Sequence, residues 1–429
     1  MAYVSASEPA LLLRLGRDSV CHAPARARPS SEPETVFDVV RERSEMDALE
    51  PEWNDLFRRA GRSDQLFQTF NWNWHWANHY VPAGGERGGP SLAVVTVRRE
   101  GRLVMLWPLV LERIAGLSVL HWMGEPVSQY GDVLAEDLPD GLRLVRQAWR
   151  FITTRLGADA ISLRKVRADA TIAPLLRELG LQQTAAAEAP YLDLASAPDF
   201  SSYELRYTAK ARKNRRRLSR RLAEQGPFAL ERHTGGAEAR AAAPQAIALK
   251  REWIKHTGRL APALADQRFA AFFADVAEGR VRPAGCGVTV LKSNGAPAGI
   301  AIDITCGTRR AAHIIVHDPR LDSFSPGTLL LEAWIKGASA DGIATFDLLA
   351  PAYAYKLDWA DGTVAVGDFA QGLTLAGRAY VHLYLGLARR TAKAVAETLP
   401  HMLSRVRALV RFARPSRRTL AEPQTPSQS

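Results

Sequence analysis

The feature that most constrains this sequence is an order of secondary-structure elements that occurs twice. In the second half, runs rich in strand-forming residues lie at 287–292, 298–305 and 311–316. The first two runs are joined across Asn294-Gly295, a strong hairpin signal because both residues tolerate positive φ. Apolar residues then recur at helical spacing from Leu331 to Ala338, and 343–349 is typical of a buried strand. The order is therefore strand, strand, strand, helix, strand.

The first half repeats this order. Strands are expected at 92–98, 103–111, 117–123 and 160–165, with a helix at 142–156 before the last strand. Ala148-Trp149 lies in the first helix as Ala333-Trp334 lies in the second, and a glycine follows each alanine by nine positions. Such self-similarity indicates duplication. We expect an α/β chain of two tandem domains, each with a mixed, mostly antiparallel sheet flanked by helices.

The length of 429 residues fits two domains with tails, and 47% hydrophobic with 24% charged residues is typical of a packed soluble protein. The boundaries we expect are a disordered N-terminal extension at 1–35, domains at 36–195 and 196–375, a basic helical region at 376–413 and a disordered tail at 414–429. The first 35 residues are rich in Pro, Ala, Ser and Arg. This composition fits a disordered extension, or a start codon assigned too far upstream.

Cysteine content and hydropathy favour a cytoplasmic location. The three cysteines, Cys21, Cys286 and Cys306, include no CxxC pair, so neither a disulfide framework nor a cysteine zinc site is expected. Near the N-terminus, Arg14 and Arg17 interrupt the short apolar run before a signal-peptide core develops. No stretch approaches the roughly 20 apolar residues that cross a bilayer. No metal cofactor is expected.

The net charge of +11 is concentrated in two segments. Residues 206–221 hold nine basic residues and no acid, and residues 389–418 hold nine basic residues and one acid. The first segment is typical of a helix whose charges stay solvated, contact the phosphates of coenzyme A or an anionic glycan, or bind nucleic acid. The second fits docking on the protein's own surface, or peripheral contact with a membrane through 376–413. The rest of the chain is mildly acidic.

An aromatic segment, residues 67–76, precedes the first set of strands, within a helix expected to begin near Glu50. Its aromatic side chains either close the core of the first domain or stack on a planar ligand. Core packing is the more common use of aromatic residues at this spacing.

Three local patterns resemble the CelD/BcsL family of acetyltransferases, a branch of the GNAT superfamily often encoded with bacterial polysaccharide biosynthesis genes. They are residues 67–76, residues 107–109 with 129–132, and residues 324–327 leading to 346–349 and 355–359. The resemblance covers roughly residues 36–375. It implies two GNAT-like domains and transfer of an acyl group from acetyl-CoA or another acyl-CoA. The same plan resembles the FemABX aminoacyl transferases, which use aminoacyl-tRNA.

The resemblance places the acyl donor at the start of the second-half helix, at Ser325, Pro326, Gly327, Thr328 and Leu329. A helix start presents unpaired N–H groups and the positive end of a dipole, and glycine allows close approach of an anion. This segment has fewer glycines than the usual GNAT phosphate loop. The corresponding helix start of the first half carries Asp140, which would repel a phosphate. The first domain is therefore expected to shape the acceptor side.

Acyl transfer needs a base for the acceptor and an acid for the departing thiolate. The catalytic residues we expect are Asp303, His317, Tyr355 and Lys356. Burial in an apolar strand would make Asp303 a stronger base, although it also fits a solvent-facing strand position. His313 better fits a core or surface histidine, and Tyr353 is a weaker choice than Tyr355. Asp132 and Asp347 are further possible bases.

Tyr130, Asp132, Asp347 and Trp359 are expected to bind the acceptor, a small molecule or glycan precursor. Three functions remain open: an acyl-CoA-dependent N- or O-acyltransferase of polysaccharide or cell-envelope biosynthesis, a tRNA-dependent aminoacyl transferase, and a non-catalytic binding protein of the same fold. Nucleic acid is an expected partner only under the second. Retention of Ser325-Pro326-Gly327 and Tyr355-Lys356 favours the enzymes.

Overall fold

The repeated order of elements is present in both halves of the computed structural model, which describes residues 34–82, 89–257, 261–279 and 283–388. In the second half the elements are β11 (Ala284–Ser293), β12 (Ala296–Cys306), β13 (Arg309–His317), α11 (Pro326–Ala340) and β14 (Thr345–Asp347). β11, β12 and β13 form an antiparallel meander, and β14 pairs in parallel with β13. The crossover between these parallel strands is α11.

The corresponding elements of the first half are β3 (Val94–Arg99), β4 (Arg102–Trp107), β5 (Leu109–Ile114), β6 (Leu117–Trp122), α4 (Gly141–Arg155) and β8 (Ala160–Arg167). The single strand expected at 103–111 is wrong in one respect, because Pro108 divides it into β4 and β5. Proline has no N–H for a sheet ladder. The two pieces join different sheets, since β4 lies in a four-stranded sheet with order β1-β3-β4-β7.

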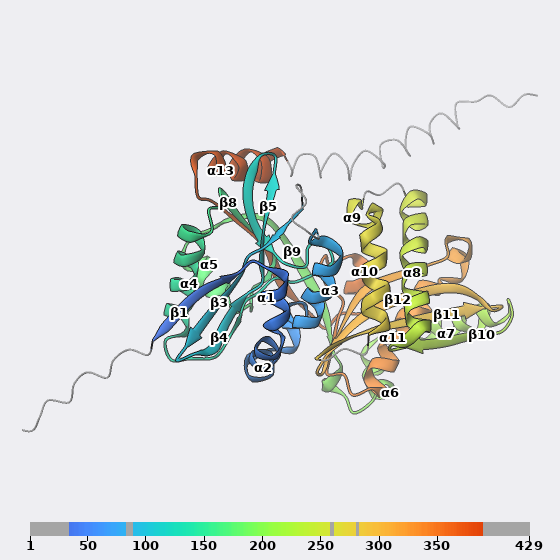
Figure 1. Cartoon of the computed structure of the whole chain (residues 1–429). Helices are drawn as coiled ribbons and strands as arrows, with labels where there is room; N and C mark the ends of the chain where they lie inside the picture. Colours follow the sequence, from blue (N-terminus) through green and yellow to red (C-terminus); the bar gives the residue numbers. More distant parts are fainter. Residues whose placement is uncertain (1–33, 83–88, 258–260, 280–282, 389–429) are drawn as a thin grey trace, which may run out of the picture. The chain divides into compact units, whose positions relative to one another are not determined.

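The other sheet has eleven strands in the order β10-β11-β12-β13-β14-β9-β15-β8-β6-β5-β2 and passes through both halves. Its centre contains β9 (Gln182–Asp193) and β15 (Gly362–Gly372), the last strands of the first and second halves. β9 pairs with β14 and β15, whereas β15 also pairs with β8. Each half therefore completes the sheet of the other, and β9 lies where the two halves meet (Figure 1).

Alternation along β12 separates two hydrophobic layers of the second half. Ile300, Ile302 and Ile304 pack on one face with residues of α8 (Gly236–Thr257) and α10 (Gln267–Glu278). Ala301 faces the other way, in a cluster with Leu330 of α11 and side chains of α7 (Ala209–Ala223). This period of two is what a strand buried on both faces requires. Helices thus cover both faces of the sheet, and the expected α/β fold class is confirmed.

The aromatic segment is not within one continuous helix from Glu50. The chain forms α2 (Glu50–Ala60), a 3₁₀ turn (Ser63–Gln68) and α3 (Phe70–Tyr80), separated at Thr69, where the backbone is extended. Phe67, Trp72 and Trp76 are almost fully buried. The aromatic side chains therefore close the core, the first of the two uses expected for them.

The remaining helical elements and strands are short. They are β1 (Thr35–Val40), α1 (Arg43–Ala48), β2 (Ser91–Leu92), β7 (Leu134–Ala135), α5 (Ala173–Glu178), η3 (Leu194–Ser196), α6 (Phe200–Tyr203), η4 (Glu204–Arg206), β10 (Phe228–His233), α9 (Pro262–Ala265), η5 (Pro319–Phe324), α12 (Ala354–Leu357), α13 (Leu375–Ala379) and the π-helix η6 (Tyr380–Ala388). The last two begin the basic region expected at 376–413, whose residues from 389 onward lie outside the described ranges. The segments 1–33 and 414–429 do as well.

Within the described residues, no helix is both long and apolar enough to cross a membrane. The domain boundaries at 195 and 375 stay predictions.

Candidate functional site

The parallel strands β13 and β14 diverge soon after they meet. Their pairing covers only Arg309 to Ala311 on β13 and Thr345 to Asp347 on β14. Beyond this point β13 continues to His317, whereas β14 ends and the chain turns away through Leu349, whose φ is 59°. The later part of β13 therefore lacks a strand partner on this side, and its backbone groups must find other partners.

Two lysines supply donors at this divergence. Lys250 of α8 donates from Nζ to the carbonyl of Ile315 on β13, at 3.1 Å. Lys356 of α12 donates from Nζ to the carbonyl of Leu349, at 2.8 Å. Burial lowers the pKa of Lys356 to about 8, and the nearby charge of Lys250 acts in the same direction, while Asp347 opposes it. A substantial fraction of Lys356 is therefore a neutral amine near pH 8.

At the end of β14, Asp347 joins the two halves through a buried polar cluster. Its Oδ1 accepts hydrogen bonds from the hydroxyl of Tyr130 and the backbone N–H of Leu349, both at 2.9 Å. Its Oδ2 contacts Arg309 at 2.9 Å and Arg167 at 3.4 Å. The Arg167 guanidinium also lies over the Tyr130 ring, 4.9 Å from its centroid. Burial, with the carboxylate beside it, raises the pKa of the Tyr130 hydroxyl, so it stays protonated as a donor.

The start of α11 has one free backbone donor. Ser325 takes a left-handed conformation with φ 52°, and its carbonyl accepts the N–H groups of Thr328 and Leu329. Pro326 has no N–H, so within the described residues Gly327 is left as the first-turn N–H without a backbone hydrogen bond. A β-carbon at Gly327 would lie 2.8 Å from Nδ1 of His317. Any larger residue here would require the imidazole or the helix start to shift.

His317 lies at the end of β13, against this helix start. Its Nε2 is 2.8 Å from Oδ1 of Asp322, which orients the ring. The neighbouring Asp318 is used by its own loop, since it contacts Arg320 at 2.6 Å. His317 and Gly327 thus lie side by side at the end of β13 and the start of α11.

Asp303 and Asp132 both have structural partners. Asp303 is fully buried and accepts from Arg232 at 2.7 Å, from Trp334 at 3.0 Å and from Thr305 at 3.1 Å. It therefore ties β12 to β10 and α11, and no oxygen is left to receive a substrate proton. Asp132 accepts from Gln65, from Arg62 and from the backbone N–H groups of Val133, Thr171 and Ile172. Burial raises the pKa of Asp132.

The aromatic residues expected near the site take different positions. Trp359 is buried, with its ring 4.7 Å from the guanidinium of Arg215 and edge-on to Tyr207. It therefore packs against α7. Tyr355 is 44% exposed and stacks on Tyr353. Tyr353 is equally exposed, at 46%, so a solvent-borne substrate can reach both tyrosines, whereas Trp359 is closed off.

The equivalent divergence in the first half is filled by the chain itself. β6 and β8 pair only from Val119 to His121 and from Ala160 to Ser162. Beyond them, the N–H of Gly131 donates to the carbonyl of Lys165 at 3.1 Å, and Nζ of Lys165 donates to the carbonyl of Ser128 at 2.7 Å. Burial lowers the pKa of Lys165 to about 8. The segment that occupies this position, residues 128–131, also contains Tyr130, whose hydroxyl donates to Asp347 of the second half.

Comparison with known protein families finds a match in the second half. Residues 209–357 match an acetyltransferase (GNAT) domain. The match runs from α7 to α12 and includes the divergence of β13 and β14, the start of α11, Asp347 and Lys356. It covers less than half of the chain, and it does not distinguish the CelD/BcsL branch. No curated protein sequence matches the chain.

Solved structures match both halves together. FemX superposes with a TM-score of 0.55 at 12% identity, covering 78% of this chain and 98% of that one. A tandem GNAT protein from the clavulanic acid biosynthesis pathway gives 0.47 at 14% identity, covering 80% and 99%. L-PGS from Bacillus licheniformis gives 0.46 at 9% identity, covering 85% and 97%. At these identities the FemX match shows that the fold is shared, and nothing more specific.

Sequence reasoning missed the cations of the site: Lys250, Arg167, Arg309 and Lys165. Each lies in a helix or strand whose local pattern gives no sign of a distant partner. Among the described residues there is no group of three or more His, Cys, Asp or Glu side chains placed to hold a metal ion.

Proposed function

We propose that this chain transfers an acetyl or other acyl group from acyl-CoA to an amine or hydroxyl acceptor, in polysaccharide or cell-envelope biosynthesis. The observation that carries the proposal is the divergence of β13 and β14, with the free N–H at the start of α11 beside the far end of β13. Along β13 it offers backbone hydrogen-bonding groups to an extended substrate. At the start of α11 it offers a helix N-terminus to an anion. Both features lie inside the segment that matches an acetyltransferase domain.

The residues present fit coenzyme A in this orientation. Within the described residues the N–H of Gly327 makes no backbone hydrogen bond, so it can donate to a phosphate oxygen. Coenzyme A supplies the activated thioester. This chain would hold its phosphates with Gly327 and the dipole of α11, whose first turn has no acid.

Two of the expected catalytic residues, His317 and Lys356, lie near opposite ends of the unpaired part of β13. From Ala311, where the strands part, to His317 is six residues, roughly 20 Å of strand. His317 therefore belongs with the phosphate end, and Lys356, bonded to Leu349, belongs near the point of divergence. We assign Lys356 as the base that accepts the acceptor's proton. Tyr355, one residue away and exposed, would protonate the thiolate.

The roles of the other expected residues change accordingly. Asp303, with its oxygens occupied by Arg232 and Trp334, stabilises the sheet and takes no part in proton transfer. The hydrogen bond between Tyr130 and Asp347 holds the end of β14 in place. Asp132 anchors the loop that contains Tyr130. Trp359 supports α7. The acceptor is left to contact Tyr355 and Lys356.

Thermal stabilisation distinguishes the two enzyme classes. Acetyl-CoA at a hundred times its Kd should raise the unfolding free energy by about 2.7 kcal/mol, whereas aminoacyl-tRNA should have no effect beyond that of uncharged RNA. A Tm shift with charged tRNA and none with acetyl-CoA would contradict this proposal. It would favour the alternative, a FemABX-like aminoacyl transferase, whose fold the FemX match shares.

The role of Lys356 predicts a pH profile. Because only the neutral amine accepts a proton, kcat/KM should rise through a pKa of about 8. Lys356→Arg keeps a positive charge that does not deprotonate, so it should lower kcat at least about a hundredfold while acetyl-CoA still raises Tm. A profile unchanged in this variant would assign the base elsewhere, with His317 next to test.

A further inference from the structure

The exposed face of α7 carries cations that have no acid beside them. Lys210, Lys213, Arg217 and Arg220 lie at helical spacing and are exposed. Among the described residues none of these four has an ion-pair partner. By contrast, the neighbouring Arg206 contacts Asp361 at 2.7 Å. A helix in which like charges stand three and four residues apart is destabilised by their repulsion.

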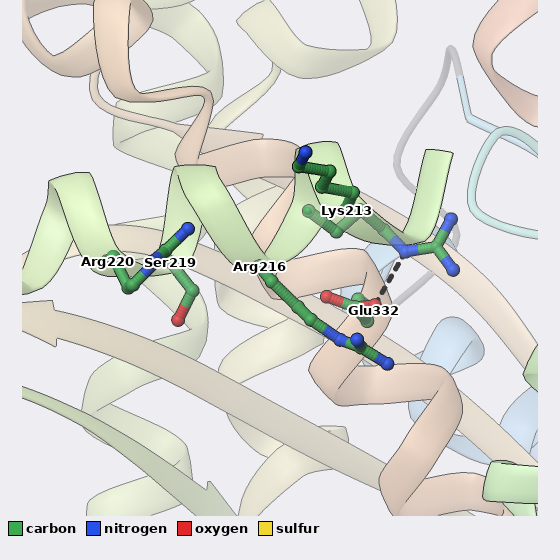
Figure 2. A pocket seen from close by; sticks show the side chains of 6 residues that line it. Lys213, Arg216, Ser219, Arg220 and Glu332 are labelled. Atoms are coloured by element: carbon green, nitrogen blue, oxygen red, sulfur yellow. Dashed lines mark hydrogen bonds and ion pairs between the residues drawn. The ribbon is translucent and has the colours of Figure 1, made fainter. Parts of the chain in front are cut away.

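A pocket of about 600 Å³ opens between this helix and α11. Its lining consists of Lys213, Arg215, Arg216, Ser219 and Arg220 from α7, with Glu332 from α11. Figure 2 shows Arg216, Ser219 and Arg220 along one stretch of α7, and the dashed line marks the bond between Arg215 Nε and Glu332, 2.6 Å long. Four cations and one acid make the pocket strongly positive.

Arg215 is the buried member of this set. It is 6% exposed, and its guanidinium lies against the rings of Tyr207 and Trp359, at 4.8 and 4.7 Å. Its Nη2 is buried without a hydrogen-bond acceptor, and Glu204, at 3.8 Å, is too far to serve. Among the described residues, Glu332 is thus the one acid within hydrogen-bond distance of this buried cation, which lines the pocket.

We propose that this pocket binds a phosphate group carried by an anionic ligand. A phosphate presents several acceptor oxygens and up to two negative charges, which matches guanidinium groups, a lysine and the Ser219 hydroxyl better than a single carboxylate does. The pocket is separate from the start of α11, since Glu332 lies seven residues along that helix, roughly 10 Å away. The inference does not depend on acyl transfer.

Inorganic pyrophosphate tests the pocket directly by isothermal titration calorimetry with the full chain. The double variant Arg216→Gln/Arg220→Gln removes two exposed cations and should weaken binding at least about tenfold. Arg150→Gln/Arg155→Gln on α4 is the matched control, because both arginines are exposed on another helix. It should bind as the parent does. Absence of pyrophosphate binding, or equal binding by both variants, would overturn the proposal.

Vesicles identify the source of the phosphate. Co-sedimentation with phosphatidylglycerol-containing vesicles but not with pure phosphatidylcholine, lost in Arg216→Gln/Arg220→Gln, would assign the pocket to a lipid headgroup. Pyrophosphate binding without vesicle binding would assign it to a soluble phosphate compound. If duplex RNA binds instead, and binding depends on Lys210 and Arg217 outside the pocket, the helix is a nucleic-acid surface and the pocket proposal fails.

Discussion

At the scale of single residues, a buried hydrogen bond from Tyr130 to Asp347 joins the two halves. Tyr130→Phe removes a buried hydroxyl that donates at 2.9 Å, but leaves Arg309 and the N–H of Leu349 on the carboxylate. We expect the unfolding free energy to fall by about 1 to 3 kcal/mol, measured by urea titration. Tyr207→Phe is the control, since its hydroxyl bonds a neutral carbonyl at 3.0 Å, and it should cost about 1 kcal/mol. Equal losses of unfolding free energy in the two variants would mean that the arginines beside Asp347 compensate for the missing hydroxyl.

A second residue, His313, gives stability a pH dependence. Its ring contacts Phe273 at a centroid distance of 4.9 Å, its Nε2 bonds the carbonyl of Val127, and its Nδ1 is buried without an acceptor. Burial lowers the pKa of His313 from 6.5 to about 4. Between these values the unfolded chain binds more protons than the folded chain, so stability is complete above pH 6.5 and declines as the pH falls toward 4.

This decline should amount to less than roughly 3 kcal/mol, because part of the His313 side chain still meets solvent. The measurement is the unfolding free energy from pH 7 to pH 4 in the parent and in His313→Gln. The glutamine can keep the bond to Val127 but does not titrate, so its curve should be flatter in this range. Parallel curves would show that other groups cause the dependence.

At the scale of elements, α11 carries a matched pair of glycines. Gly327→Ala places a methyl group 2.8 Å from His317 Nδ1, so the helix start or the imidazole must move. We expect the affinity for acetyl-CoA, measured from the Tm shift that it causes, to fall severalfold, and the Tm of the unliganded protein to fall slightly. Gly337→Ala on the same helix meets no atom within 4 Å, and it should raise stability by about 0.5 to 1 kcal/mol. An unchanged response to acetyl-CoA in Gly327→Ala would remove this helix start from the donor site.

The elements also show how far local sequence patterns reach. The strands on both sides of Asn294-Gly295 and the helix from Pro326 follow from turn, capping and periodicity signals that act over a few residues. β9 does not, since its sequence from Gln182 mixes alanine with polar residues and its partners lie more than a hundred residues away along the chain. For the same reason the arginines around Asp347 were missed. They come from β8 and from the first residue of β13, and only the folded sheet brings them together.

At the scale of the whole molecule, the exchange of final strands makes each half depend on the other. Without the second half, β9 would lose both β14 and β15, and β8 would lose one neighbour. Unpaired strand edges are unstable in isolation and promote aggregation. Fragments 34–195 and 196–388, divided at the expected domain boundary, should therefore each fail to give a cooperative thermal transition. Expressed together, they should co-purify and recover one transition, because β9 and β15 can then pair.

The intact chain should likewise unfold in a single step, observed equally by tryptophan fluorescence and by circular dichroism. Tryptophans report mainly on the first half, where Trp53, Trp72, Trp76 and Trp107 are buried, whereas circular dichroism reports on both halves. Coincident curves would mean that the exchanged strands couple the halves into one cooperative unit. Two separated transitions, or a first fragment that melts cooperatively by itself, would show that the sheet of each half is stable without the other's strand. The exchange would then be a late docking step in folding and not a condition for it.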